Sequence, residues 1–517
     1  MANKLENSKI VVHRTHIAIH DYDPGDAPSI ERTFSVYNKA YFRYEPKCIY
    51  YDAETRTLKI PRRTSIERLE KYFNSVAAID YSYDHYRDIS PIGLKYTPRD
   101  DDQKEAIKFI LGMGRYQSNE RKSMLALNLN TGKGKTYCTV ASIAYLGIAS
   151  AVITANTGVL EQWKKFILEY TDISERDICI VTGTPTIQRL LRSNPDSYKV
   201  YLFTHGTLNS YGTNHGWNKV GELFAYLGIG LKIYDECHMN FDNMAMIDFY
   251  TNTHTTLYLT ATLARSDYEE NEIYKLYFNG VPCIDLFHSD DDPHTKYVGI
   301  KYNSHPSPIQ IQDCYSTYGI DRNGYTDYLV KQPNFEKMLH ILINMALKKP
   351  GKCLWYIGTN ESILYIRDWI CNHYPELIGN VGIYTSIVPK EYKAEQLEKK
   401  IILSTTKSAG AAMDIKGLVE TVNLAEPFKS RVLAQQTLGR TRDEGTIYKD
   451  IVDVAFPQMR KFYAYKKPVF TKYATECNEV ILRDEELEQR YHTIQEERKD
   501  AWCPISFEDD RKKWEPK

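Results

Sequence analysis

The sequence lacks several features that would place a protein in a simple class. Its formal net charge is only −1 over 517 residues, which excludes a uniformly charged surface for nucleic acid or lipid. Its 10 cysteines include no C-x-x-C pair and no Cys/His cluster with zinc spacing. We therefore expect reduced thiols, as in a cytoplasmic protein, rather than a disulfide framework or a zinc site.

Long hydrophobic runs are also scarce. The first residues, MANKLENSKI, are polar, so we expect no signal peptide. Residues 137–160 carry no charge and are long enough to span a membrane, but they are rich in Thr, Ser, Gly and Ala. We expect a buried helix followed by a buried strand there, and no membrane partner.

The pattern of apolar residues divides the chain into four parts. Residues 1–95 alternate apolar and polar residues in short runs, which predicts a small accessory α+β domain. Residues 96–285 and 286–470 contain continuous apolar runs separated by stretches of helical length, which predicts two α/β domains with doubly wound parallel sheets. Residues 471–517 are charged, and we expect a helical C-terminal tail.

The accessory part carries a local concentration of positive charge. An amphipathic helix is predicted over residues 64–76, with Thr64 or Ser65 as its N-cap. Both a DNA contact and a solvated face fit this charge, and both interpretations stay open. The basic residues concerned are Lys59, Arg62, Arg63, Arg68 and Lys71.

The stretch LNLNTGKGKTYCTV, residues 127–140, predicts a phosphate-binding loop between a strand and a helix. Glycines let backbone N–H groups surround an anion, and the helix N-terminus adds partial positive charge. Lys135 can reach the β- and γ-phosphates of a nucleotide, and the Thr136 hydroxyl can bind Mg²⁺. The strict pattern begins with Gly where Leu129 stands, so a chance turn is the alternative. The expected nucleotide-binding residues are Thr131, Gly132, Lys133, Gly134, Lys135 and Thr136.

Two adjacent acids follow another apolar run, LKIY, one hundred residues after Lys135. Buried carboxylates are costly unless they hold something charged. Asp235 is expected to bind Mg²⁺, and Glu236 is expected to polarise a water molecule that attacks the γ-phosphate. Two acids that merely occupy a strand-to-loop junction are the alternative.

In this order, TGKGKT, DECH and LTAT resemble motifs of superfamily 2 helicases and translocases, and the resemblance covers roughly residues 96–456. PRDDDQKEAI resembles the segment with the adenine-reading glutamine, here Gln103, and ITANTGVLEQWKKF resembles motif Ia. ILSTTKSAGAAMDI resembles motif V, with Gly410 and Asp414 in the usual positions. QQTLGRTRDEG resembles motif VI and contains Gln436, Arg440 and Arg442.

The resemblance implies two RecA-like domains in tandem with ATP and Mg²⁺ between them. Lys135, Thr136, Asp235 and Glu236 would come from the first domain, and Gln436, Arg440 and Arg442 from the second. Motif VI usually places its second arginine one position later than Arg442. Either arginine could therefore be the arginine finger, which stabilises charge on the phosphates from the second domain, and Arg440 is preferred.

Within the superfamily, DECH, LTATLARSD and EQW resemble the branch with XPB, RecG-like enzymes and UvsW-like phage helicases. That resemblance implies an ATP-dependent DNA helicase or translocase, working as a monomer on single-stranded, forked or branched DNA. Recombination, repair and replication are the expected processes, in the host-cell cytoplasm if the protein is from a bacteriophage. The C-terminal tail is the expected site for a protein partner.

Three alternatives remain at this point. The motor motifs grip phosphates and sugars, so an RNA helicase or transcript-release factor fits them equally. An ATP-binding switch that does not unwind is a second alternative, although intact motif residues argue against it. A motor subunit of a nuclease or restriction complex is the third, and its nuclease would have to come from a partner.

Overall fold

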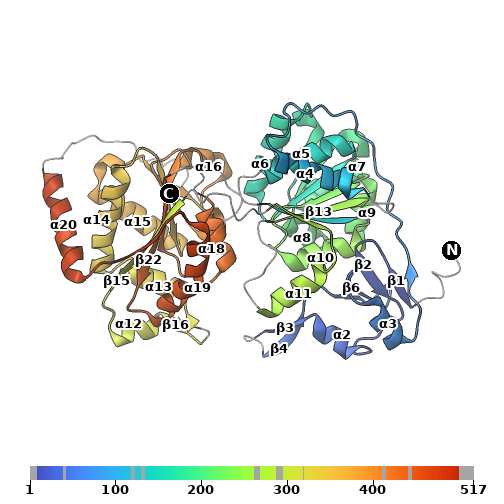
Figure 1. Ribbon diagram of the computed structural model, residues 1–517, viewed down its shortest axis with the longest axis horizontal. Helices are drawn as coiled ribbons and strands as arrows, with labels where there is room; N and C mark the ends of the chain where they lie inside the picture. The colour runs from blue at the N-terminus through green and yellow to red at the C-terminus, as the bar shows by residue number, and fades with distance from the viewer. Residues whose placement is uncertain are drawn as a thin grey trace. The chain divides into compact units, whose positions relative to one another are not determined.

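The computed structural model describes residues 9–38, 42–117, 123–129, 134–260, 268–286, 295–317, 319–409, 415–440 and 445–499. The chain forms two compact units, residues 1–289 and 290–517 (Figure 1). Each unit contains a seven-stranded sheet in which every strand pair is parallel. The predicted pair of doubly wound α/β domains is therefore confirmed.

The first parallel sheet has the strand order β10-β11-β9-β12-β13-β8-β14. Its strands are nearly all buried, as expected for continuous apolar runs covered on both faces. The strands are β8 (Met124–Asn128), β9 (Ser150–Thr154), β10 (Ile178–Val181), β11 (Val200–Thr204), β12 (Leu231–Tyr234), β13 (Thr255–Thr260) and β14 (Cys283–Asp285). The helices are α4 (Asp101–Leu111), α5 (Lys135–Leu146), α6 (Thr157–Tyr170), α7 (Gly183–Arg192), α8 (His205–His215), α9 (Asn218–Tyr226), α10 (Phe241–Tyr250) and α11 (Tyr268–Phe278).

The uncharged stretch over residues 137–160 forms most of α5 and then β9, as the composition predicts. Eight consecutive residues of α5, from Tyr137 to Ala144, are buried in the first domain. Among the helices that the structure describes, none is long and apolar enough to cross a membrane.

The second parallel sheet has the order β19-β20-β18-β21-β22-β15-β23. This order repeats the first sheet strand for strand, with β15 in the place of β8 and β18 to β23 in the places of β9 to β14. The strands are β15 (Thr295–Tyr302), β18 (Lys352–Ile357), β19 (Val381–Tyr384), β20 (Ile401–Ser404), β21 (Leu418–Ala425), β22 (Thr446–Asp453) and β23 (Cys477–Ile481). The helices are α12 (Pro308–Asp313), α13 (Arg322–Leu329), α14 (Pro333–Leu347), α15 (Asn360–His373), α16 (Lys390–Gln396), α17 (Thr406–Ala409), α18 (Arg431–Leu438), α19 (Pro457–Tyr473) and α20 (Asp484–Lys499).

The C-terminal segment is part of the second unit. The expected helix is present as α20, which packs on α14 through buried Leu487 and Ile494 and an ion pair between Lys337 and Glu488. A strand that the charge pattern did not predict, β23, pairs with β15 at the edge of the sheet. The segment thus completes the seventh position of the repeated topology.

The N-terminal residues form a small mixed sheet, β5-β6-β2-β1-β7, in which only the β1–β7 pair is parallel. Ser65, one of the two predicted N-caps, accepts a hydrogen bond from the Arg68 backbone N–H. One hydrophobic core joins this sheet to the first parallel-sheet domain within the first unit. The elements are β1 (Ile10–Val12), β2 (His16–Ile19), α2 (Pro28–Thr33), β3 (Ser35–Asn38), β4 (Arg43–Pro46), β5 (Tyr50–Asp52), β6 (Thr57–Pro61), α3 (Ile66–Phe73) and β7 (Ala78–Ile79).

Candidate nucleotide site at the edge of the first sheet

The carboxyl ends of β12, β13 and β8 are neighbours in the first sheet. The phosphate loop follows β8, and the adjacent acids follow β12. Ligands of open α/β sheets bind at this edge, outside the carboxyl ends of the strands. The topology therefore brings together two sequence motifs that lie one hundred residues apart.

Gly134, the N-cap residue just before helix α5, has the left-handed backbone conformation, with φ of 84°. A Cβ at this position would collide with the side-chain nitrogen Nε2 of Gln103. Gln103 is held in place because its Oε1 accepts from the Arg99 backbone N–H at 2.9 Å and its own N–H donates to Asp100 Oδ1 at 2.9 Å. The glutamine predicted to read adenine thus lies directly against the loop predicted to bind phosphate.

Lys135 and Glu236 form an ion pair, with 3.2 Å between Nζ and Oε1. Both side chains are nearly buried, at 12% and 10% exposed. Glu236 has φ of 50°, a conformation that non-glycine residues rarely adopt and that concentrates at functional sites. The lysine expected to meet phosphates and the glutamate expected to act on water are therefore within reach of each other.

His238 connects Glu236 to the end of β13, the neighbouring strand in the sheet. Its Nδ1 lies 3.4 Å from Glu236 Oε2 and 3.1 Å from the Thr260 hydroxyl at the end of β13. His238 is the last residue of the DECH motif, but it was not among the predicted site residues. Its place in that motif, two residues after Glu236, is the signal that could have identified it.

Asp235 is held by a tryptophan. The indole Nε1–H of Trp163 donates to Asp235 Oδ2 at 2.8 Å, and the Asp235 backbone N–H donates to Ile153 O at 3.0 Å. Burial, together with the nearby charge of Glu236, raises the pKa of Asp235 to about 6, although Trp163 and Lys135 oppose the rise. The carboxylate is thus costly to keep charged without a cation.

The oxygen donors at this edge fit a magnesium–nucleotide complex. Mg²⁺ is usually bound by one or two carboxylates together with substrate phosphates and water. Asp235 supplies a carboxylate, and Thr136 supplies a hydroxyl in the first turn of α5. Within the described parts of the chain, no group of three or more His, Cys, Asp or Glu residues is placed to hold a metal ion. Phosphate and water oxygens would therefore have to complete the magnesium site.

Two of the predicted motif VI residues lie at the end of α18 in the second domain. Gln436 is in the helix, Arg440 follows it, and both are buried. Burial raises the pKa of Tyr356 on β18, and the Arg440 charge opposes that rise. The Tyr356 hydroxyl donates to Ala409 O at 3.3 Å. Motif VI and the start of motif V therefore meet around Tyr356.

Several predicted site residues lie outside the residues that the structure describes, so their predicted roles stay predictions. They are Thr131, Gly132, Lys133, Gly410, Asp414 and Arg442.

The predicted basic surface of the accessory domain is divided. Lys59 faces α10, where its Nζ donates to Phe249 O at 3.0 Å and lies 3.5 Å from the centre of the Tyr250 ring. Burial lowers the pKa of Lys59 to about 8. Arg68 and Lys71 on α3 are exposed. Only part of the predicted charge is accessible to a polyanion.

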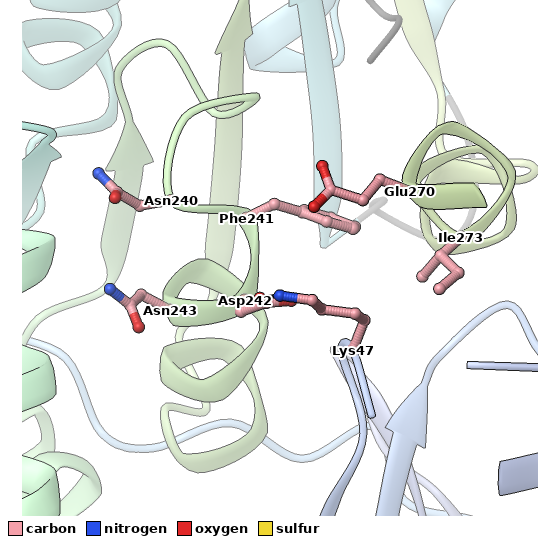
Figure 2. Close-up of a pocket in the computed structure, with 7 residues that line it drawn as sticks. All are labelled: Lys47, Asn240, Phe241, Asp242, Asn243, Glu270 and Ile273. Carbon is pink, nitrogen blue, oxygen red and sulfur yellow. Dashed lines mark hydrogen bonds and ion pairs between the residues drawn. The ribbon is translucent and has the colours of Figure 1, made fainter. Parts of the chain in front are cut away.

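A separate cavity of about 320 Å³ lies where the accessory domain meets α10 and α11. Figure 2 shows Lys47 reaching Asp242 on α10, an ion pair of 2.7 Å, with Glu270 and Ile273 on α11 at the other side. The residues that line this cavity do not include Lys135, Asp235 or Glu236.

Comparison with known proteins agrees with this site. Residues 95–265 match the family described as the res subunit of type III restriction enzymes. The DNA 3′-5′ helicase XPB of Mycobacterium tuberculosis is 28% identical over 149 residues, which are 29% of this chain. The match spans only 25% of that relative's length.

Solved structures extend the likeness to both domains. Dbp5 of S. cerevisiae bound to RNA and ADP BeF3 covers 76% of this chain and 92% of its own, with 12% identity and a TM-score of 0.52. T4 UvsW covers 92% of this chain and 99% of its own, with 15% identity and a TM-score of 0.35. The RecA-like fold of the two parallel sheets is confirmed by the first of these likenesses. With the family match and the XPB relative, these findings confirm the resemblance that the motifs indicated: the chain is a protein of the superfamily 2 helicase fold, similar to XPB over 149 residues.

Proposed function

We propose that the protein is an ATP-dependent DNA helicase or translocase that remodels forked or branched DNA. One observation carries the proposal: Lys135 and Glu236 are paired at 3.2 Å, beside Asp235, at the edge where the phosphate loop ends. A lysine for phosphates, a carboxylate for the metal and a second carboxylate for water are the parts that nucleotide hydrolysis requires.

Each residue has one role in this proposal. Lys135 binds the β- and γ-phosphates, and the N-terminus of α5 adds partial positive charge. Thr136 and Asp235 would hold Mg²⁺, which neutralises developing phosphate charge when bound. When the nucleotide binds, Lys135 leaves its ion pair with Glu236 and contacts the phosphates. Glu236 then orients the attacking water and accepts a proton from it. Gln103 contacts the base.

The second domain would supply Gln436 and Arg440, with Arg442 as the alternative arginine, together with Gly410 and Asp414 of motif V. An arginine that reaches the phosphates only when two domains close makes hydrolysis depend on closure. Repeated closure then moves the domains along a strand held through its phosphates. ATP hydrolysis without movement along the strand would instead indicate the nucleic-acid-binding switch.

The choice of DNA is supported by the XPB relative, which is named as a DNA 3′-5′ helicase. We therefore also propose translocation from 3′ to 5′ along one strand. An RNA helicase or transcript-release factor is the second candidate, because the Dbp5 likeness is to a structure bound to RNA. We further propose a monomer and a cytoplasmic setting, which is the host-cell cytoplasm if the protein is from a bacteriophage. A role in recombination, repair or replication and a protein partner for the C-terminal tail complete the proposal.

The proposal is tested by ATP hydrolysis without nucleic acid and with single-stranded DNA, duplex, a four-way junction or RNA. Glu236→Gln serves as the blank, since it should bind ATP without hydrolysing it. We expect stimulation by DNA, strongest with the junction. Stimulation by RNA alone would replace DNA with RNA as the substrate, and the absence of turnover on every substrate would refute the motor.

A further inference from the structure

Trp163 lies where two strands that are distant in sequence become neighbours. It is the seventh residue of α6, which follows β9, whereas Asp235 follows β12. β9 and β12 pair in parallel, with Ile153 opposite Tyr234. This pairing places the indole Nε1–H at 2.8 Å from Asp235 Oδ2 across 72 residues of chain.

The chemistry of the indole suits it to orienting a carboxylate. Trp163 is only 2% exposed, so its N–H has no access to bulk water and needs a protein acceptor. An indole N–H is a donor with no acceptor function, so it cannot itself bind a metal cation. The terminal torsion of an aspartate is broad, and a fixed donor on one oxygen restricts it.

We propose that Trp163 is the positioning residue that sets the orientation of the Asp235 carboxylate for Mg²⁺. This inference rests on the proposed ATP-dependent function and adds a residue to it. Partners of metal ligands hold the ligand in its binding orientation, and their loss typically lowers metal affinity. Trp163 acts through Asp235.

The chain offers a matched control in the second domain. Trp369 on α15 is 9% exposed, and its Nε1–H donates to Glu336 at 3.3 Å. Trp163→Phe and Trp369→Phe therefore remove the same kind of bond from two buried indoles. Loss of packing affects both variants, whereas loss of metal orientation affects only the first.

The test measures the affinity of the full-length protein for Mn²⁺ in the presence of ADP, by electron paramagnetic resonance. Mn²⁺ is used in place of Mg²⁺. We expect Trp163→Phe to weaken Mn²⁺ binding by about 10-fold or more, with ADP binding in EDTA unchanged. Trp369→Phe should match the wild type. In the double variant with Asp235→Asn, Trp163→Phe should add nothing to the effect of Asp235→Asn.

Unchanged Mn²⁺ affinity in Trp163→Phe, or equal losses in both tryptophan variants, would overturn the inference. The proposed function would still stand if the wild type hydrolyses ATP. Failure of the wild type to bind Mn²⁺ with ADP would refute the proposed function as well. If Trp163→Phe does not fold, the indole ¹⁵N spectrum of the wild type replaces it. Mn²⁺ with ADP should then broaden the Trp163 signal, which is assigned by elimination with Phe variants of the other five tryptophans, and an unbroadened signal would refute the inference.

Discussion

The two parallel sheets place carboxylates at equivalent positions but use them differently. Asp235 and Glu236 follow β12, the fourth strand of the first sheet, and Glu426 follows β21, the fourth strand of the second. Glu236 is paired with the lysine of the phosphate loop. Glu426 instead pairs with Arg322 and accepts from the Thr406 N–H at 2.6 Å and the Thr406 hydroxyl at 2.5 Å.

The difference shows what turns a buried acid into a reactive one. In both places burial raises the carboxyl pKa, for Asp235 and for Glu426. In the second domain, an arginine and a helix N-terminus of the same domain satisfy the charge. In the first, the principal cation is Lys135, which a nucleotide can draw away. We propose that the partner, and not the strand-end position, distinguishes the acid that acts on a nucleotide from the structural one.

The largest expected effect comes from removing that partner. Lys135→Ala should lower ATP turnover by about 10²-fold or more, because the phosphate charge loses its main cation. Steady-state phosphate release measures the change. Lys104→Ala, which removes an exposed ion pair with Asp101 on α4, is the control and should retain wild-type turnover. Near-normal turnover in Lys135→Ala would remove the basis of the comparison.

The second prediction concerns the structural acid. Glu426→Gln should lower the free energy of unfolding of the second domain by about 1–3 kcal/mol, because Arg322 and the Thr406 N–H lose a charged acceptor. Thermal and urea unfolding measure it. A stability equal to that of the wild type would mean that Glu426 does not lock the strand end.

How much of this arrangement the sequence predicts depends on whether the signal is local. The buried strands and the order of motifs are predicted because apolar runs and the Gly134–Lys135–Thr136 pattern are contiguous. The Trp163–Asp235 bond is not, because β10 and β11 separate β9 from β12 in sequence but not in the sheet. Strand β23 was missed because an exposed edge strand owes its pairing to β15 rather than to its own composition. The sequence does not predict that Lys59 faces α10, because its partner there lies 190 residues away along the chain.

A third prediction uses pH. Because the pKa of Asp235 is raised to about 6 in the nucleotide-free protein, its carboxyl gains a proton as the pH falls through that value. Mg²⁺ must then displace the proton, so the Mg²⁺ concentration for half-maximal nucleotide binding should rise as the pH falls below about 6. Titration with a fluorescent nucleotide measures this, and Asp235→Asn should abolish the dependence. A dependence that survives in Asp235→Asn would assign it to another group.

The smallest effect is expected on the accessory domain, which packs against the first sheet's domain. Arg68→Glu with Lys71→Glu should weaken DNA binding and reduce its salt dependence by about one unit of slope for each phosphate that the variant no longer neutralises. ATP turnover without DNA should not change. Binding isotherms at several salt concentrations measure the slope, and unchanged affinity would assign the exposed charge of α3 to solvation.

The most direct test of the account compares Glu236→Gln and Glu426→Gln in one assay of DNA-stimulated ATP hydrolysis, at a temperature where both are folded. The account predicts that Glu236→Gln binds ATP but loses about 10²-fold or more in kcat, while Glu426→Gln keeps a kcat near that of the wild type. Equal losses in both, or wild-type turnover by Glu236→Gln, would contradict the claim that the acid paired with the phosphate-loop lysine is the one that hydrolyses ATP.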